Sequence, residues 1–181
     1  MRLSNSEQAY GIVTKVLHWL TALLITGLIV LGWYMVELTY YDRWYHDSTE
    51  SHKALGMAVF ALGVITLVWR RVSASPVHQA SLKPWQRIAA TAMHHTLFAL
   101  ILLIPATGYL ISTSAGKTID IFGWFEIPAL FDVSTRLRDL AIACHYYLAY
   151  GTAALVVLHA AAAFKHQLID RDGTLARMLW R

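Results

Sequence analysis

Cysteine is almost missing from this chain, because its 181 residues contain only one, Cys144. A single cysteine excludes an internal disulfide, and it excludes the C-x-x-C-H motif that attaches a c-type haem. Charged residues are also scarce, at 14% of the chain, and proline occurs four times. We therefore expect any haem here to be bound non-covalently, and we expect little material for a separate soluble domain.

Long hydrophobic runs account for most of what remains. The chain is 57% hydrophobic with a mean hydropathy of +0.47. Four apolar segments, at about 16–36, 48–71, 88–112 and 140–164, have the length needed to cross a bilayer. Since backbone polar groups must be paired inside lipid, each segment should be helical. The sequence predicts an all-α, integral membrane four-helix bundle that forms a single domain over residues 1–181.

The charges predict how this bundle is oriented. The formal net charge is +4 and the pI is about 9.3. Basic residues are in excess beside both termini and in the second connection, whereas the first and third connections are acidic. Because cytoplasmic loops carry the excess of Lys and Arg, both termini are expected in the cytoplasm. The basic net charge thus reflects how the bundle is oriented in membrane lipid, and nucleic acid is not an expected partner.

The last apolar segment carries two histidines, His145 and His159, fourteen residues apart. Fourteen helical residues return to within roughly 40° of the same face and rise about 21 Å. One helix face therefore presents an imidazole near each membrane surface. Hydrogen bonding to neighbouring helices is the alternative role for such histidines.

Two other helices supply histidines at matching depths. His18 lies at the start of the first helix, near the inner surface with His159. His52 lies near the start of the second helix, which enters from outside, and so shares the depth of His145. Topology alone therefore predicts two facing pairs, His18 with His159 and His52 with His145.

A facing pair of imidazoles inside a bundle is the axial arrangement of a low-spin b-type haem, which transfers electrons and leaves no iron position for oxygen. Helix rise would put two such irons about 20 Å apart. Zinc is the competing metal, but it usually needs four ligands in a tighter cluster. A proton relay is a further alternative, disfavoured because no intramembrane Asp or Glu accompanies the histidines. A third alternative is a haem-free scaffold or transporter.

Two glycines share the helix face of His52, since Gly56 follows it by four residues and Gly63 by eleven. Glycine there would admit a flat macrocycle against the backbone. Ordinary packing of small residues between helices explains the same pattern, and the sequence leaves both interpretations open.

Several motifs together resemble the bacterial cytochrome b-561 family of four-helix dihaem membrane proteins, over nearly the whole chain. They are His18-Trp19-Leu20, His52-Lys53-x-x-Gly56, His94 eleven residues before Pro105, and His145 with His159. Residues 40–46 and 108–125 are closer to one branch of the family, represented in Escherichia coli. The resemblance implies that the four paired histidines bind the irons of two haem b groups, that His94 lies near the inner haem, and that ubiquinone is the electron partner.

These patterns predict transmembrane electron transfer through two bis-histidine haem b groups coupled to the ubiquinone pool, with a periplasmic redox partner. Lys53 is a candidate partner for a haem propionate by position. Some family members oxidise superoxide, but acidic outer connections would repel that anion, so superoxide ranks below a protein or quinol partner. The alternative function is that of a cytochrome b anchor subunit in a larger dehydrogenase or hydrogenase.

Overall fold

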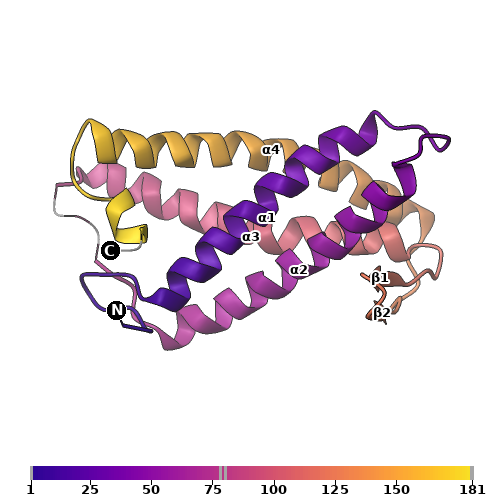
Figure 1. Ribbon diagram of the computed structural model, residues 1–181, viewed down its shortest axis with the longest axis horizontal. Helices are drawn as coiled ribbons and strands as arrows, with labels where there is room; N and C mark the ends of the chain where they lie inside the picture. Colours follow the sequence, from indigo (N-terminus) through magenta and orange to yellow (C-terminus); the bar gives the residue numbers. More distant parts are fainter. Residues whose placement is uncertain (1, 78, 80, 180–181) are drawn as a thin grey trace.

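The computed structural model describes residues 2–77, 79 and 81–179, and it consists mainly of four long helices lying side by side (Figure 1). All four are long and apolar enough to cross a membrane. The predicted all-α membrane bundle is therefore confirmed. The helices are α1 (Ile12–Val36), α2 (Tyr45–Val72), α3 (Pro84–Thr113) and α4 (Thr135–Leu168), followed by a short 3-10 helix, η1 (Leu175–Met178).

Each helix is longer than its apolar segment. α2 begins at Tyr45 rather than near residue 48, and α4 runs from Thr135 to Leu168 rather than from about 140 to 164. Hydropathy marks only the part of a helix that needs lipid, whereas the helix continues into polar residues until a cap ends it. At α4 this cap is Ser134, whose Oγ accepts a hydrogen bond from the Leu137 N–H at 3.3 Å. That residues 1–181 form one domain stays a prediction.

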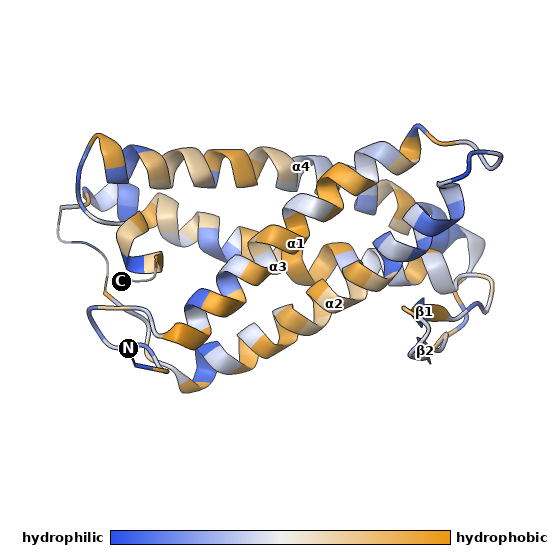
Figure 2. Cartoon of the chain, viewed as in Figure 1, coloured by the Kyte–Doolittle hydropathy of each residue, from blue (hydrophilic) through white to orange (hydrophobic). Residues whose placement is uncertain are grey.

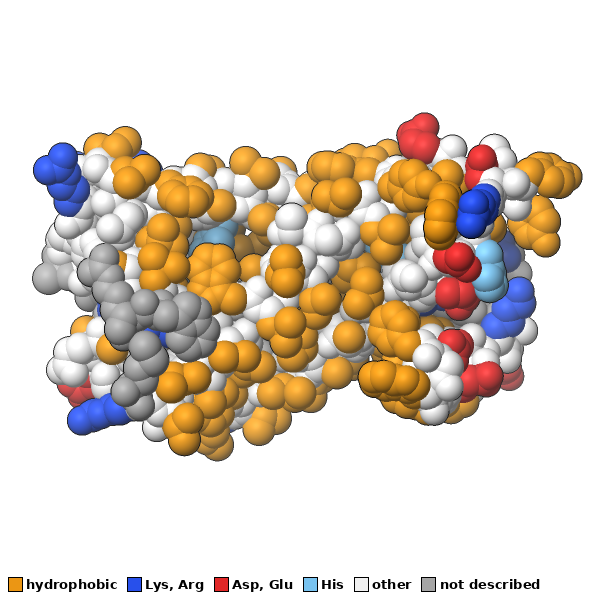
Figure 3. Space-filling view, in the orientation of Figure 1, with side chains coloured by type: hydrophobic (Ala, Val, Ile, Leu, Met, Phe, Trp, Pro, Cys, Tyr) orange, Lys and Arg blue, Asp and Glu red, His pale blue; other side chains and the backbone are white. Residues whose placement is uncertain are grey.

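Hydropathy divides the bundle into a middle zone and two polar ends. Apolar residues cover the middle of the helices (Figure 2), and the charged side chains visible in Figure 3 gather at the two ends. Few residues within the apolar windows are buried inside the protein, at most 17% of any window. Most residues of these windows are therefore at least partly exposed on the surface of the bundle.

Close helix packing follows chain order. α1 packs on α2, α2 on α3 and α3 on α4, but α1 and α4 approach each other at few positions. Gly63 belongs to the α2–α3 contact, because a Cβ there would lie 2.7 Å from a methyl group of Leu102 and 2.9 Å from one of Ile101. Helix packing is therefore the role of Gly63.

The third connection contains a hairpin that the sequence analysis did not foresee. Strand β1 (Ile119–Ile121) pairs antiparallel with β2 (Phe125–Ile127), with Ile119 opposite Ile127. Ile119 is 1% exposed, and β1 packs on α2. The Tyr109 hydroxyl donates to the Pro128 carbonyl at 2.8 Å and accepts from the Leu130 N–H at 2.8 Å. Packing on helices stabilises this hairpin, which is too short to be stable alone.

Both chain termini lie at the opposite end of the bundle from the hairpin (Figure 1). The Asn5 side chain accepts hydrogen bonds from the Gly11 N–H at 2.8 Å and the Thr14 hydroxyl at 2.7 Å. It also donates to the Ala74 carbonyl at 2.8 Å. The segment before α1 is thereby joined to the end of α2.

Candidate functional site

His52 and His145 join α2 to α4; they are called the outer pair, and His18 and His159 the inner pair, after the membrane sides predicted from the charges. The ring centres of His52 and His145 are 6.2 Å apart and their planes meet at 67°. Nδ1 of His145 lies 3.0 Å from the Ile104 carbonyl oxygen of α3. Because a carbonyl oxygen only accepts, this contact requires the proton on Nδ1 and leaves the Nε2 lone pair available for a metal. The α3 backbone therefore sets both the tautomer and the orientation of His145.

Two glycines contact the edges of the outer rings. A Cβ at Gly108 would lie 3.2 Å from Cε1 of His145, and a Cβ at Gly32 would lie 3.4 Å from Cε1 of His52. A Cβ at Gly108 would press on the His145 ring, whereas one at Gly32 would make an ordinary van der Waals contact with the His52 ring. The sequence analysis did not assign Gly32 or Gly108 to the site, although Gly108 follows Pro105 by one helical turn and a glycine inside an apolar helix is a usable signal.

The inner histidine pair joins α1 to α4. The ring centres of His18 and His159 are 6.3 Å apart and their planes meet at 65°. Two further rings adjoin the pair: Trp19 lies 5.3 Å from His18, and His94 of α3 lies 5.5 Å from His159. The structure thus brings together both predicted pairs and places His94 beside the inner one.

The ring separations match a single ion between each pair. A metal–imidazole bond of about 2.0 Å, plus about 1.1 Å from the nitrogen to the ring centre, gives about 6.2 Å when doubled across one ion. Neither pair belongs to a group of three or more metal-ligating side chains within the described residues. Two protein ligands are too few for a structural zinc site, whereas they complete the coordination of an iron already held by four porphyrin nitrogens.

The surroundings of the pairs also suit a flat cofactor. Within the described part of the chain α4 makes few close contacts with α1 and fewer with α2, although each pair spans one of these interfaces. A Cβ at Gly56 would meet no heavy atom of the described residues within 4 Å. Helix packing therefore does not explain Gly56, in contrast to Gly63. Nδ1 of His52 is buried without a hydrogen-bond partner among the described residues.

Several cations that lie near the paired histidines in the sequence have other partners in the structure. Lys53 forms an ion pair with Glu50 at 2.7 Å, and Arg138 pairs with Asp139 at 2.8 Å. Lys15 donates to the Leu179 carbonyl at 2.6 Å. Of these, Lys53 is the one that directly follows a paired histidine in the sequence, so it remains the cation placed next to the outer pair.

Four membrane-length helices with two facing imidazole pairs define a helical membrane protein with two candidate sites for a metal cofactor. A family model described as prokaryotic cytochrome b561 matches residues 9–181. The chain belongs to the prokaryotic cytochrome b561 family, as the sequence motifs indicated. It is thus a membrane electron-transfer protein of a family whose cofactor is haem b.

Three curated relatives cover nearly the whole chain. Cytochrome b561 homolog 2 of Escherichia coli (strain K12) is 42% identical over 99% of this chain and 95% of its own length. Cytochrome b561 homolog 1 of the same organism is 27% identical over 91% and 93%. The probable superoxide oxidase CybB of Yersinia pestis is 28% identical over 96% and 97%.

Proposed function

We propose that this protein carries electrons across the bacterial inner membrane through two haem b groups and exchanges them with ubiquinone. The outer haem is held by His52 and His145, and the inner haem by His18 and His159. The observation that carries this proposal is the pair of ring separations, 6.2 and 6.3 Å, each suited to one axially ligated iron. Each bound haem supplies one-electron chemistry.

The residues around the pairs orient the ligands and keep water away. The Ile104 carbonyl accepts the Nδ1 proton of His145, so the lone pair of Nε2 is left for the metal. With two histidines as its protein ligands, a haem iron would have no position open for oxygen and would supply electron transfer. Four apolar helices of membrane-spanning length surround the two pairs, and in a bilayer they would limit the access of water.

The two pairs are spaced for transmembrane transfer. His145 and His159 lie fourteen residues apart on the single helix α4, which corresponds to about 21 Å along its axis. That length covers much of a hydrocarbon core about 30 Å thick. We place the His52–His145 pair on the periplasmic side and both termini in the cytoplasm, from the distribution of Lys and Arg.

Three further residues are proposed to contact the haems. Gly56 provides a flat backbone surface beside the outer haem, and Lys53 pairs with one of its propionates in exchange for, or together with, Glu50. His94, 5.5 Å from the His159 ring, lies at the edge of the inner haem.

Superoxide oxidation is a second candidate activity, because a relative that is 28% identical is named a probable superoxide oxidase. We rank it below exchange with a protein or quinol, since the first and third connections are acidic and would repel an anion. Superoxide should therefore reduce this protein slowly. A rate near the diffusion limit that falls steeply with salt would reverse this ranking.

The proposal is tested by quantifying haem in purified protein and recording reduced-minus-oxidised spectra. Wild type should contain two haem b per chain, and His145→Ala and His159→Ala should each contain one. His95→Ala, on the same membrane side as His94 but with its Nδ1 bonded to the Thr91 carbonyl of its own helix at 2.8 Å, should keep two. One haem or none in wild type would return the histidines to a helix-bridging or proton-handling role.

The quinone partner needs its own test. Chemically reduced protein in detergent is mixed with a short-chain ubiquinone, and reoxidation of the haems is followed by stopped-flow absorption. Oxidation of both haems by the quinone supports the proposal. Reoxidation no faster than in quinone-free buffer, in protein that retains two haems, would remove ubiquinone from it and leave the haem assignment intact.

A further inference from the structure

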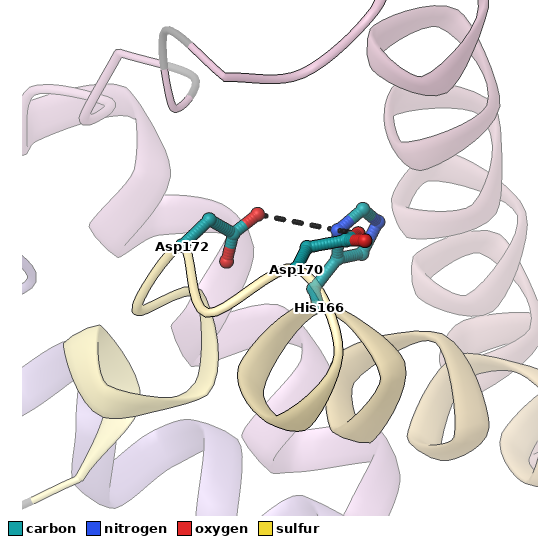
Figure 4. A group of neighbouring side chains, drawn as sticks. All are labelled: His166, Asp170 and Asp172. Atoms are coloured by element: carbon teal, nitrogen blue, oxygen red, sulfur yellow. Dashed lines mark ion pairs between the residues drawn. The ribbon is translucent and has the colours of Figure 1, made fainter.

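Three potential metal ligands converge just beyond the end of α4, away from both histidine pairs. His166 lies in the last turn of α4, and Asp170 and Asp172 lie in the segment that follows (Figure 4). Nδ1 of His166 is 2.7 Å from Oδ2 of Asp170 and 3.2 Å from Oδ2 of Asp172. One donor atom from each residue lies within 4.8 Å of the others.

The atoms in these short contacts are not aligned as donor and acceptor of a hydrogen bond. Among the described residues, neither His166 Nδ1 nor Asp172 Oδ2 has a hydrogen-bond partner, and both atoms are buried. The Asp172 side chain is only 3% exposed, and its other oxygen accepts from the Thr174 N–H at 2.9 Å. A buried carboxylate oxygen without a hydrogen bond is costly, and this one is directed at a ring nitrogen (Figure 4).

The spacing of the donors suits one ion bound by all three residues. Ligands about 2.1 Å from an ion and about 90° apart lie about 3.0 Å from each other. The observed separations of 2.7 and 3.2 Å lie on either side of that value. One imidazole with two carboxylates is a donor set for divalent transition metals such as Zn²⁺ or Mn²⁺.

The backbone is shaped so that both carboxylates face His166. Arg171 and Gly173 have φ values of 53° and 76°, and a left-handed non-glycine residue is an unfavourable conformation that surrounding contacts must maintain. The contacts here include the Asp172 N–H, which donates to the His166 carbonyl at 3.2 Å. The Gln79 side chain donates to the Asp172 carbonyl at 3.0 Å, so the loop before α3 also supports the cluster.

We propose that His166, Asp170 and Asp172 bind one divalent transition-metal ion, which fastens the C-terminal segment to the end of α4. The ion would share Oδ2 of Asp170 with Lys165, whose ammonium is 2.6 Å away, or displace that ammonium. Fastening this segment affects the inner pair, because the Trp19 indole N–H donates to the Met178 carbonyl at 2.8 Å and Trp19 adjoins His18. The rival explanation is a protonated His166 held between two carboxylates, with no metal.

The test measures Zn²⁺ binding to haem-loaded protein whose purification tag has been removed. After treatment with EDTA, the protein is dialysed against Zn²⁺ and the metal per chain is measured by mass spectrometry, with affinity from calorimetry. Wild type and the controls His95→Gln and Asp132→Asn should bind one Zn²⁺. His166→Gln and Asp172→Asn should bind at least about tenfold more weakly. Equal binding in all five proteins, or none in wild type, would overturn the proposal in favour of the protonated histidine.

A second readout does not depend on counting metal. Arg171 is exposed between the two carboxylates, so trypsin cleavage after it reports on how firmly this segment is held. Zn²⁺ should slow that cleavage in wild type and leave it unchanged in Asp172→Asn. Because Asp172 is buried, the exposed Asp170→Asn is included as a variant expected to fold, and the haem spectrum of each protein verifies its folding. Cleavage that Zn²⁺ slows equally in wild type and both variants would show that the ion acts elsewhere.

Discussion

The two histidine pairs have nearly the same ring separation but different surroundings. At the outer pair, helix backbones contact the rings: the Ile104 carbonyl lies 3.0 Å from His145 Nδ1, and Gly32 and Gly108 adjoin the ring edges. At the inner pair, the neighbours are other rings, those of Trp19 and His94. Equal spacing is thus reached by backbone contacts at one end and by side-chain packing at the other. The outer pair should therefore be the more sensitive to changes of residue size, and the inner pair to changes of polarity.

The largest effect is expected at Gly108. In Gly108→Val the new side chain would collide with the His145 ring, because the Cβ alone would come within 3.2 Å of it. We expect the outer haem to be lost, so that haem content falls from two to about one per chain. The measurement is haem quantified per chain together with the reduced spectrum.

Ala99→Val is the control for this change, since it enlarges an exposed position of α3 and should keep both haems. If Gly108→Val also kept both, with unchanged spectra, the close approach of α3 to His145 would not be needed to position the ring. The proposed difference between the outer pair, positioned by backbone contacts, and the inner pair, positioned by side chains, would then be wrong.

A smaller effect is expected at Thr107, whose hydroxyl donates to the Ile104 carbonyl at 2.7 Å and lies 3.1 Å from His145 Nδ1. In Thr107→Val the carbonyl loses a competing donor, so its hydrogen bond to His145 strengthens and favours the oxidised haem. A change of about 0.5–1 kcal/mol in a hydrogen bond corresponds to about 20–40 mV for one electron. Redox titration should show the outer potential falling by that amount.

The inner potential should not change in Thr107→Val. Thr26→Val removes a hydroxyl that bonds only within its own helix, to the Ala22 carbonyl at 2.8 Å, and should leave both potentials in place. An inner potential that shifted together with the outer one would mean that the two pairs do not respond independently.

At the inner pair we expect His94→Phe to keep two haems and to lower the inner potential by about 20–40 mV, the value of one modest polar interaction. His94 places a polar ring 5.5 Å from that of His159, and losing this polarity should disfavour the electron-rich state. The matched variant His95→Phe alters the neighbouring position on another face and should leave the potential unchanged. If the inner potential shifted equally in both variants, the effect would come from a general change at this surface of α3 and not from the contact of His94 with the inner pair.

The smallest effect concerns the acidic first connection. Hydrogen bonds from the side chain and backbone of Thr39 lower the pKa of Asp42 below its ordinary value. A lowered carboxyl pKa adds stability above the ordinary pKa, and this stability is lost as pH falls through the folded-state pKa. In Thr39→Ala the pKa of Asp42 should rise toward its ordinary value, as measured by NMR titration. Haem content and both potentials should not change. A pKa that did not move would show that the backbone hydrogen bond alone maintains it.

Much of this architecture could be predicted because lipid imposes strong rules on sequence. Apolar runs of spanning length indicated four helices, and the alternating direction of successive helices put His18 level with His159 and His52 level with His145. The helix ends could not be predicted as well, since Tyr45 and Thr135 begin helices in polar sequence where hydropathy carries no signal. The hairpin was missed because Ile119 owes its burial to α2, which is distant in the sequence.

The sequence alone determined the membrane-spanning helices, the family and the depth of each histidine, because helix rise and hydropathy are local properties. Only the tertiary structure decided which backbone faces each ring: that Ile104 bonds His145, that Gly108 adjoins it, and that Gly63 packs on α3 while Gly56 does not. It alone also brought Asp170 and Asp172 to His166, through a left-handed turn at Arg171. These features depend on how helices rotate against one another and how a loop folds back, which no spacing along one chain specifies.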